Sequence, residues 1–95
     1  MKTKNSVYIL RSETNPSRRY TGLTSDIEQR LQWHNAGQNT HTIKDRPWAL
    51  FASFHFRHER TARHFEKYLK SGSGRAFAKR HFDEPIAVIS ACISN

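Results

Sequence analysis

The sequence has a single cysteine, Cys92, among its 95 residues. One cysteine can form neither an internal disulfide nor a CxxC metal site, a pattern typical of proteins in a reducing compartment without structural zinc. Long apolar runs are missing too. No stretch approaches the about 20 apolar residues of a membrane span, and the apolar run near the N-terminus is too short for a signal peptide. We therefore expect a cytoplasmic protein without a membrane partner.

Acidic residues are few compared with basic ones. Eight Asp and Glu stand against sixteen Lys and Arg, which gives a formal net charge of +8. Such an excess indicates a partner with repeating negative charge, and nucleic acid is the first candidate. The alternative is a soluble basic domain without such a partner, because net charge reports on partners and solubility rather than on fold.

Linker-like segments are scarce as well. No internal repeat occurs, and residues 71–74, which read SGSG, are too few for a domain boundary. A hydrophobic content of 36% over this length suffices for one modest core. We expect a single domain over 1–95, with its core at about 6–82. The C-terminal tail, 83–95, could be an edge strand, a packing arm or a dimer contact.

Two short strands are predicted near the N-terminus, at 7–10 and 19–22. Between them, residues 15–17 read Asn-Pro-Ser, a cluster typical of a hairpin turn. Each arm carries one tyrosine, Tyr8 in the first and Tyr20 in the second. We therefore expect the two rings to be neighbours.

The first helix is predicted from Asp26 to about Ala36, ending at Gly37. Ser25 and Glu28 have the spacing of a capping box, in which the two side chains satisfy free backbone N–H groups. Asp26 would complement the helix dipole.

The inward face of this helix is defined by Ile27 and Leu31. Arg30 and His34 share that face at helical spacing. A solvated arginine normally lies on the opposite side, so this placement favours side chains that point into a cleft.

The second half of the chain is predicted to hold one strand and two helices. Residues 38–46 are polar and read as a loop, while 47–56 read as a third and more buried strand. A helix is expected from 59 or 60 to 70, and a short basic helix over 75–82. Glu66 borders the apolar stripe of the longer helix.

Three side chains that usually face water, Arg30, His34 and Glu66, are thus directed toward the layer that holds Tyr8 and Tyr20. Phosphodiester hydrolysis needs a group that deprotonates water, a cation that neutralises charge at phosphorus, and a metal or acid for the leaving oxygen. One carboxylate with several waters and a phosphate oxygen forms a normal magnesium site. The set therefore matches this chemistry.

The tripeptides at 6–8 (SVY) and 20–22 (YTG) are separated by eleven residues. They are similar to the signature of the GIY-YIG nuclease family, which is named for two such tripeptides. The resemblance covers most of the chain, because Arg30, His34 and Glu66 follow in the order in which that family carries its conserved positions. The length resembles that of its small stand-alone members.

The resemblance implies an α/β fold of the α+β type, with a small, mainly antiparallel three-stranded sheet flanked by helices. Tyr8 would be the general base or water positioner, with Tyr20 hydrogen-bonding beside it. Arg30 would contact the scissile phosphate, and His34 would assist proton transfer or phosphate binding. Glu66 would hold Mg²⁺ or Mn²⁺.

Basic residues on the hairpin, the second helix and the third helix are the predicted contacts to nucleic acid. They are Arg18, Arg19, Arg63, Lys67, Lys70, Arg75 and Lys79. The basic residues of the second helix could instead form an ordinary solvated face. DNA is the expected partner, RNA is the alternative, and the C-terminal tail could bind a protein.

The sequence departs from the family pattern at two places. Ser6, Val7 and Thr21 replace a glycine and two isoleucines of the family name. Many family members also carry an asparagine after the glutamate-bearing helix, whereas none follows Glu66 before Asn95.

The leading hypothesis is therefore a metal-dependent endonuclease that hydrolyses DNA, structure-selective or non-specific, in repair or processing. The rivals are a non-cutting nucleic-acid-binding module and an adaptor to a larger repair partner.

The same residues also have structural interpretations. Tyr8 and Tyr20 could be cross-strand packing partners, Arg30 and Glu66 an ion pair between helices, and His34 a packing residue. A free tyrosine has a pKa near 10, so it is a poor base at neutral pH. Tyr8 needs nearby positive charge that favours its phenolate, or a group that relays its proton.

Overall fold

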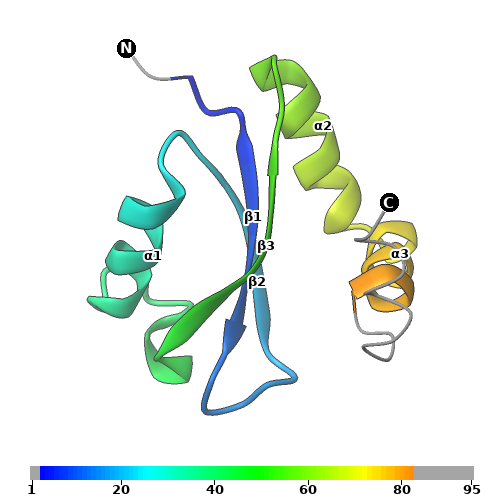
Figure 1. Ribbon diagram of the computed structural model, residues 1–95. Helices are drawn as coiled ribbons and strands as arrows, with labels where there is room; N and C mark the ends of the chain where they lie inside the picture. The colour runs from blue at the N-terminus through cyan, green and yellow to red at the C-terminus, as the bar shows by residue number, and fades with distance from the viewer. Residues whose placement is uncertain (1–2, 83–95) are drawn as a thin grey trace, which may run out of the picture.

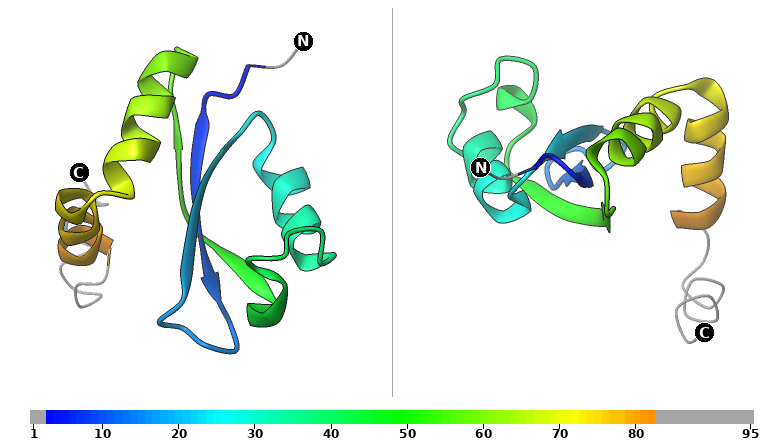
Figure 2. Two further views of the ribbon diagram at one scale, coloured as in Figure 1. Left: turned by 180° about the vertical axis from the view of Figure 1, so that it is seen from behind. Right: turned by 90° about the horizontal axis from the view of Figure 1, so that it is seen from above.

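The computed structural model describes residues 3–82. Along the chain the elements are β1 (Ser6–Ser12), β2 (Arg19–Thr24), α1 (Ile27–Asn35), the 3₁₀ helix η1 (Ile43–Asp45), β3 (Trp48–His55), α2 (Glu59–Leu69) and α3 (Gly72–Phe82). The three strands form one antiparallel sheet in the order β2-β1-β3. Helix α1 covers one face of the sheet, and α2 and α3 lie on the other (Figures 1 and 2). The predicted α+β fold is thus confirmed. The tail at 83–95 lies outside the described residues.

Strand β1 is the buried centre of the sheet. It pairs with a strand on each side, and Val7 and Leu10 have no exposed surface. The prediction that the third strand is the more buried one is wrong, because β3 lies at an edge and its Leu50 is 44% exposed. Aromatic and branched residues favour any strand, and they do not reveal which strand is central.

Alternation along β1 gives the domain two cores, one on each face of the sheet. Val7 and Ile9 pack among residues of α2 and α3. Tyr8 and Leu10 point the other way and form a cluster with Trp48, against which residues of α1 pack. Side chains alternate between faces because a strand has a period of two. Tyr8 therefore lies on the α1 side of the sheet.

The hairpin between β1 and β2 confirms the predicted turn. The N–H of Arg18 donates to the carbonyl of Asn15 at 2.8 Å, which closes the connection. In the resulting register Tyr8 is opposite Gly22, and Leu10 is opposite Tyr20. Both tyrosines thus lie on one face of neighbouring strands.

The N-terminus of α1 corrects the predicted capping box. Asp26, not Ser25, is the N-cap, and its carboxylate accepts from the N–H of Gln29 at 3.0 Å. Helix α1 consequently begins at Ile27, one residue later than predicted. Asp26 has an extended backbone, so its side chain reaches the third residue of the helix as an N-cap requires.

The junction between α2 and α3 corrects a second prediction. Helix α3 begins at Gly72 instead of Arg75, so most of the SGSG segment is helical. The hydroxyl of Ser71 accepts from the N–H of Gly74 at 3.1 Å, as in an N-cap. Serine thus starts the new helix immediately after α2 ends at Leu69.

No helix within residues 3–82 is long and apolar enough to cross a membrane.

Gly74 lies where α3 meets the end of α2. A Cβ on Gly74 would overlap the backbone carbonyl of Tyr68, whereas a Cβ on Gly72 would meet nothing. We expect Gly74→Ala to lower the free energy of unfolding by about 1–3 kcal/mol, because backbone must shift. The matched control, Gly72→Ala, should leave it unchanged or raise it by up to about 1 kcal/mol. Urea unfolding of both variants measures this, and equal effects would contradict the close contact.

Candidate active site

The site lies at the open edge of the sheet, where Tyr8 crosses over Gly22 of β2. A Cβ on Gly22 would overlap the Tyr8 phenol, including its hydroxyl oxygen. Because glycine has no side chain, the ring can lie flat over the partner strand and carry its hydroxyl toward the sheet edge. Tyr8 itself is only 2% exposed. The last residue of the YTG tripeptide is thus required by the packing of the first tyrosine.

A buried chain of hydrogen bonds connects Tyr8, His34 and Thr42. The Tyr8 hydroxyl lies 3.0 Å from His34 Nε2, and His34 Nδ1 lies 3.0 Å from Thr42 Oγ1. Thr42 Oγ1 also donates to the carbonyl of Asn39 at 3.5 Å. With the His34 proton on Nδ1, every donor of this chain has an acceptor, because Nδ1–H donates to Thr42 and the single proton of Thr42 points to Asn39. Nε2 is then unprotonated and accepts from the Tyr8 hydroxyl.

The electrostatics agree with a neutral Tyr8–His34 pair. Burial raises the pKa of Tyr8 far above its usual value, Tyr20 and Glu66 add to the rise, and Arg30 only partly opposes it. Burial also lowers the pKa of His34 below 6.5, and the charge of Arg30 lowers it further. Of the two routes considered for Tyr8, a phenolate favoured by Arg30 does not match this pKa shift, because desolvation outweighs the charge of Arg30. The other route, in which a neighbouring group accepts the proton of Tyr8, remains available because His34 is hydrogen-bonded to the Tyr8 hydroxyl.

Tyr20 completes an aromatic cluster on the α1 side. Its ring centroid lies 4.7 Å from that of His34 and 6.2 Å from that of Tyr8. The prediction that the two tyrosine rings are neighbours is confirmed. His34 is the only residue of α1 that is fully buried, and Ile27 and Leu31 pack more loosely at the edge of the same cluster.

Arg30 lies one turn before His34 on α1, with its guanidinium carbon 4.8 Å from the centroid of the Trp33 ring. Its charge lowers the pKa values of both Tyr8 and His34, which places it beside the pair. The suggested Arg30–Glu66 ion pair is wrong. Glu66 binds Lys70 of its own helix, at 3.0 Å between Oε2 and Nζ.

Glu66 approaches the cluster from the opposite face of the sheet. Its side chain is 22% exposed, and its negative charge contributes to the raised pKa of Tyr8. Within residues 3–82 no group of three or more His, Cys, Asp or Glu is placed to share a metal ion. A lone, partly exposed carboxylate fits an ion such as Mg²⁺, which keeps several waters and prefers oxygen ligands.

Thr42 and Asn35, which the sequence did not single out, position the Tyr8–His34–Thr42 hydrogen-bond chain through their contacts with Trp48. The indole N–H of Trp48 donates to the carbonyl of Thr42 at 2.8 Å. Asn35 braces Trp48 in turn, accepting from its N–H at 2.6 Å and donating to its carbonyl at 3.0 Å. Trp48 is thus a packing residue of this cluster. Thr42 lies in a polar loop without periodicity and Asn35 lies beside it, so no sequence pattern marks either residue. The one available signal was that a buried His34 needs a hydrogen-bond partner for its Nδ1.

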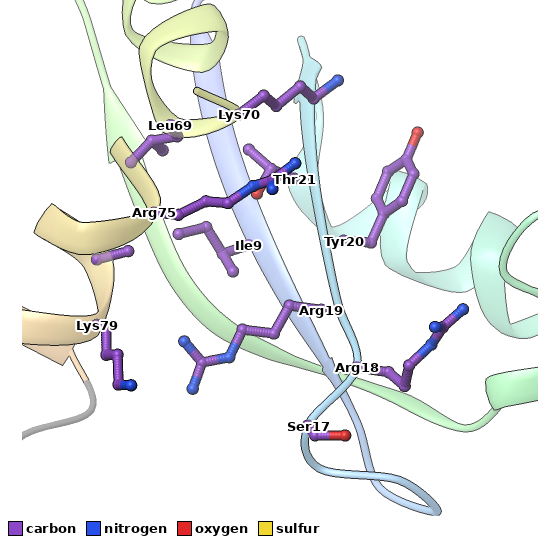
Figure 3. Close-up of a pocket in the computed structure, with 11 residues that line it drawn as sticks. Ile9, Ser17, Arg18, Arg19, Tyr20, Thr21, Leu69, Lys70, Arg75 and Lys79 are labelled. Atoms are coloured by element: carbon purple, nitrogen blue, oxygen red, sulfur yellow. The ribbon is translucent and has the colours of Figure 1, made fainter. Parts of the chain in front are cut away.

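A basic cavity of about 720 Å³ adjoins this cluster on the α2 and α3 side of β2 (Figure 3). It gathers five of the basic residues predicted to contact nucleic acid, namely Arg18, Arg19, Lys70, Arg75 and Lys79. Two others do not line it. Arg63 is bound to Glu59 at 2.7 Å, and Lys67 is exposed elsewhere on α2. We call this space the basic cavity.

Comparison with known proteins agrees with this geometry. A family model described as the GIY-YIG catalytic domain matches residues 4–81. No curated protein and no solved structure matches the chain. The match spans β1 to α3 and includes both tyrosines, the relay histidine, the arginine of α1 and the glutamate of α2. The chain therefore belongs to the GIY-YIG nuclease family.

Proposed function

We propose that this protein is a metal-dependent endonuclease that hydrolyses phosphodiester bonds in DNA. It would be structure-selective or non-specific and would act in DNA repair or processing in the cytoplasm. The observation that carries the proposal is the buried hydrogen bond from Tyr8 to His34, with Arg30 and Glu66 beside it. Any buried tyrosine needs an acceptor for its hydroxyl, but a purely structural one does not need charges of both signs, here Arg30 and Glu66, near it.

Tyr8 and His34 supply the proton chemistry. As water attacks phosphorus, its proton passes to the Tyr8 hydroxyl oxygen while the Tyr8 proton passes to Nε2 of His34. Tyr8 stays neutral throughout, so its raised pKa does not oppose the step, and His34 becomes the imidazolium. Thr42 holds the imidazole in the tautomer that leaves Nε2 free to accept.

Arg30 and Glu66 supply the charge chemistry. The guanidinium of Arg30 is stacked on Trp33, and its planar fork can hold two phosphate oxygens as negative charge develops. Glu66 would hold Mg²⁺ or Mn²⁺, which when bound neutralises charge on the phosphate and the leaving oxygen. Lys70 already occupies one oxygen of Glu66, so metal binding competes with this ion pair or shares the carboxylate with it.

The first prediction concerns Glu66. Replacing Glu66 with Gln should reduce magnesium-dependent cleavage by at least roughly 100-fold, because the neutral amide is a poor ligand for a hard cation. DNA binding in chelator should be unchanged or tighter, since a negative charge near phosphate is removed. Cleavage of supercoiled, single-stranded and branched DNA measures this effect.

The matched control is Glu13→Gln in the exposed hairpin. It should cleave as the wild type does. Full metal-dependent activity of the Glu66→Gln variant would contradict the assignment. No cleavage by the wild type on any of these nucleic acids would instead favour a non-cutting binding module.

A second prediction concerns Tyr8. In Tyr8→Phe the ring remains but the hydroxyl is lost, so cleavage should fall by roughly 100-fold or more. Nε2 of His34 is left buried without a donor, which should cost about 1–3 kcal/mol of stability. Rates should therefore be compared at a temperature where both proteins are folded. Tyr68→Phe, at a 40% exposed tyrosine, is the control and should change neither quantity.

A third prediction concerns pH. His34 must be neutral to accept the proton, and burial and Arg30 hold its pKa below 6.5. Cleavage should therefore persist as the pH falls through 6.5 and decline only at lower pH, where His34 is protonated. The pH dependence of kcat/KM on one DNA substrate measures this limb. A midpoint above 6.5 would rule out His34 as the acceptor.

The stability of the fold should also decrease at low pH. Below pH 6.5 the unfolded chain protonates His34 more readily than the folded protein does, so the free energy of unfolding should decrease with falling pH. Urea unfolding at several pH values, with His34→Gln as the comparison, separates this loss from the loss of activity.

A further inference from the structure

We infer that the basic cavity is a phosphate-binding subsite that holds the nucleic-acid backbone on one side of the scissile bond only. The inference rests on the proposed nuclease function for the position of that bond. The inference adds a direction to the binding of nucleic acid. From the reacting residues, the nucleic-acid strand would run toward the start of β2 and not toward its end.

The walls of the cavity come from separate elements. Arg19 projects from β2, and Lys70, Arg75 and Lys79 come from the end of α2 and from α3. Figure 3 shows Arg19 extending toward Lys79, while Arg18 points to the other side of β2. Ion pairing agrees, because Arg18 binds Asp45 at 3.3 Å. Four cations therefore share one opening.

The chemistry of the cavity suits phosphate. No acidic residue lines it among the residues that the structure describes. Glu66 balances the charge of Lys70, and the cations of β2 and α3 together favour an anion in the opening. The guanidinium carbon of Arg19 is 4.3 Å from the centroid of the Phe51 ring, a contact that orients this side chain. Arginines and lysines from several directions match the several oxygens of a phosphodiester chain.

The cavity adjoins the reacting residues across β2. Tyr20 lines the cavity from this strand, while its ring lies on the α1 side of the sheet, 4.7 Å from His34 between ring centroids. Lys70 lines the cavity and lies 3.0 Å from Glu66. A nucleic-acid strand with one phosphate beside Tyr8 would reach the cavity by passing over β2. A volume of about 720 Å³ admits a short stretch of backbone.

The other end of β2 leads into acidic residues of the chain that follows it. The strand begins next to Arg18 and Arg19, and after Thr24 the chain continues to Asp26 and Glu28 at the start of α1. Glu28 is exposed, and a carboxylate repels phosphate. Along the edge strand itself, basic residues precede the reacting residues and acidic residues follow them. The backbone is favoured at the start of β2 and disfavoured at its end.

The first test measures binding in chelator, where cleavage does not interfere. Arg75→Ala/Lys79→Ala should weaken binding of a fluorescent duplex by roughly tenfold or more. It should also reduce the slope of log affinity against log salt by about 0.9 for each residue. The charge-matched control is Arg57→Ala/Arg60→Ala, at two exposed arginines outside the cavity, and should change affinity less than twofold.

The second test measures direction. Two methylphosphonates, which carry no charge, are placed on either the 5′ or the 3′ side of the observed cleavage position. With the wild type, cleavage should slow by roughly tenfold for one side and by less than twofold for the other. Arg75→Ala/Lys79→Ala should lose this difference. Arg75→Lys/Lys79→Arg should keep it, and thermal midpoints confirm that all variants are folded.

Two results would overturn the inference: wild-type affinity in Arg75→Ala/Lys79→Ala, or equal methylphosphonate effects on both sides. Failure of the nuclease proposal looks different, since the wild type would then cleave nothing. Cavity-dependent binding in the first test would still support the phosphate subsite in that case.

Discussion

The site depends on the close approach of Tyr8 to Gly22. Their pairing in the hairpin places the phenol directly over a residue without a side chain, so the ring can reach His34 on α1. Any Cβ at this position would displace the ring and break the first hydrogen bond of the relay. β2 also stays an edge strand, so residues from both faces of the sheet can meet around it.

Burial stabilises the fold and sets the protonation of the site at the same time. Tyr8 belongs to the same apolar cluster as Leu10 and Trp48, so the contacts that hold α1 on the sheet also remove water from the phenol. Desolvation disfavours the charged form of both Tyr8 and His34. The result is a neutral donor and a neutral acceptor held by Thr42. Such a pair can transfer protons without a buried charge at rest.

Most of the local structure and much of the site were predictable from the sequence, because they depend on short-range patterns. Apolar periodicity indicated the strands and helices, and helical spacing placed Arg30 and His34 on one face. The two tyrosines were expected to be neighbours because one short turn joins their strands. Predictions failed where neighbouring residues are equally suited to one position. Ser25 and Asp26, for example, are both good N-cap residues for α1.

The sequence by itself thus determined the elements, the residue types of the candidate site and the positive net charge, all properties of neighbouring residues or of composition. Only the tertiary structure decided which strand is central, that Thr42 is the partner of His34, and that Lys70 and Arg75 share a cavity with residues of β2. It also decided the direction of the Tyr8 pKa shift. The physical reason is that burial and desolvation depend on what packs against a residue from distant parts of the chain, which local patterns do not encode.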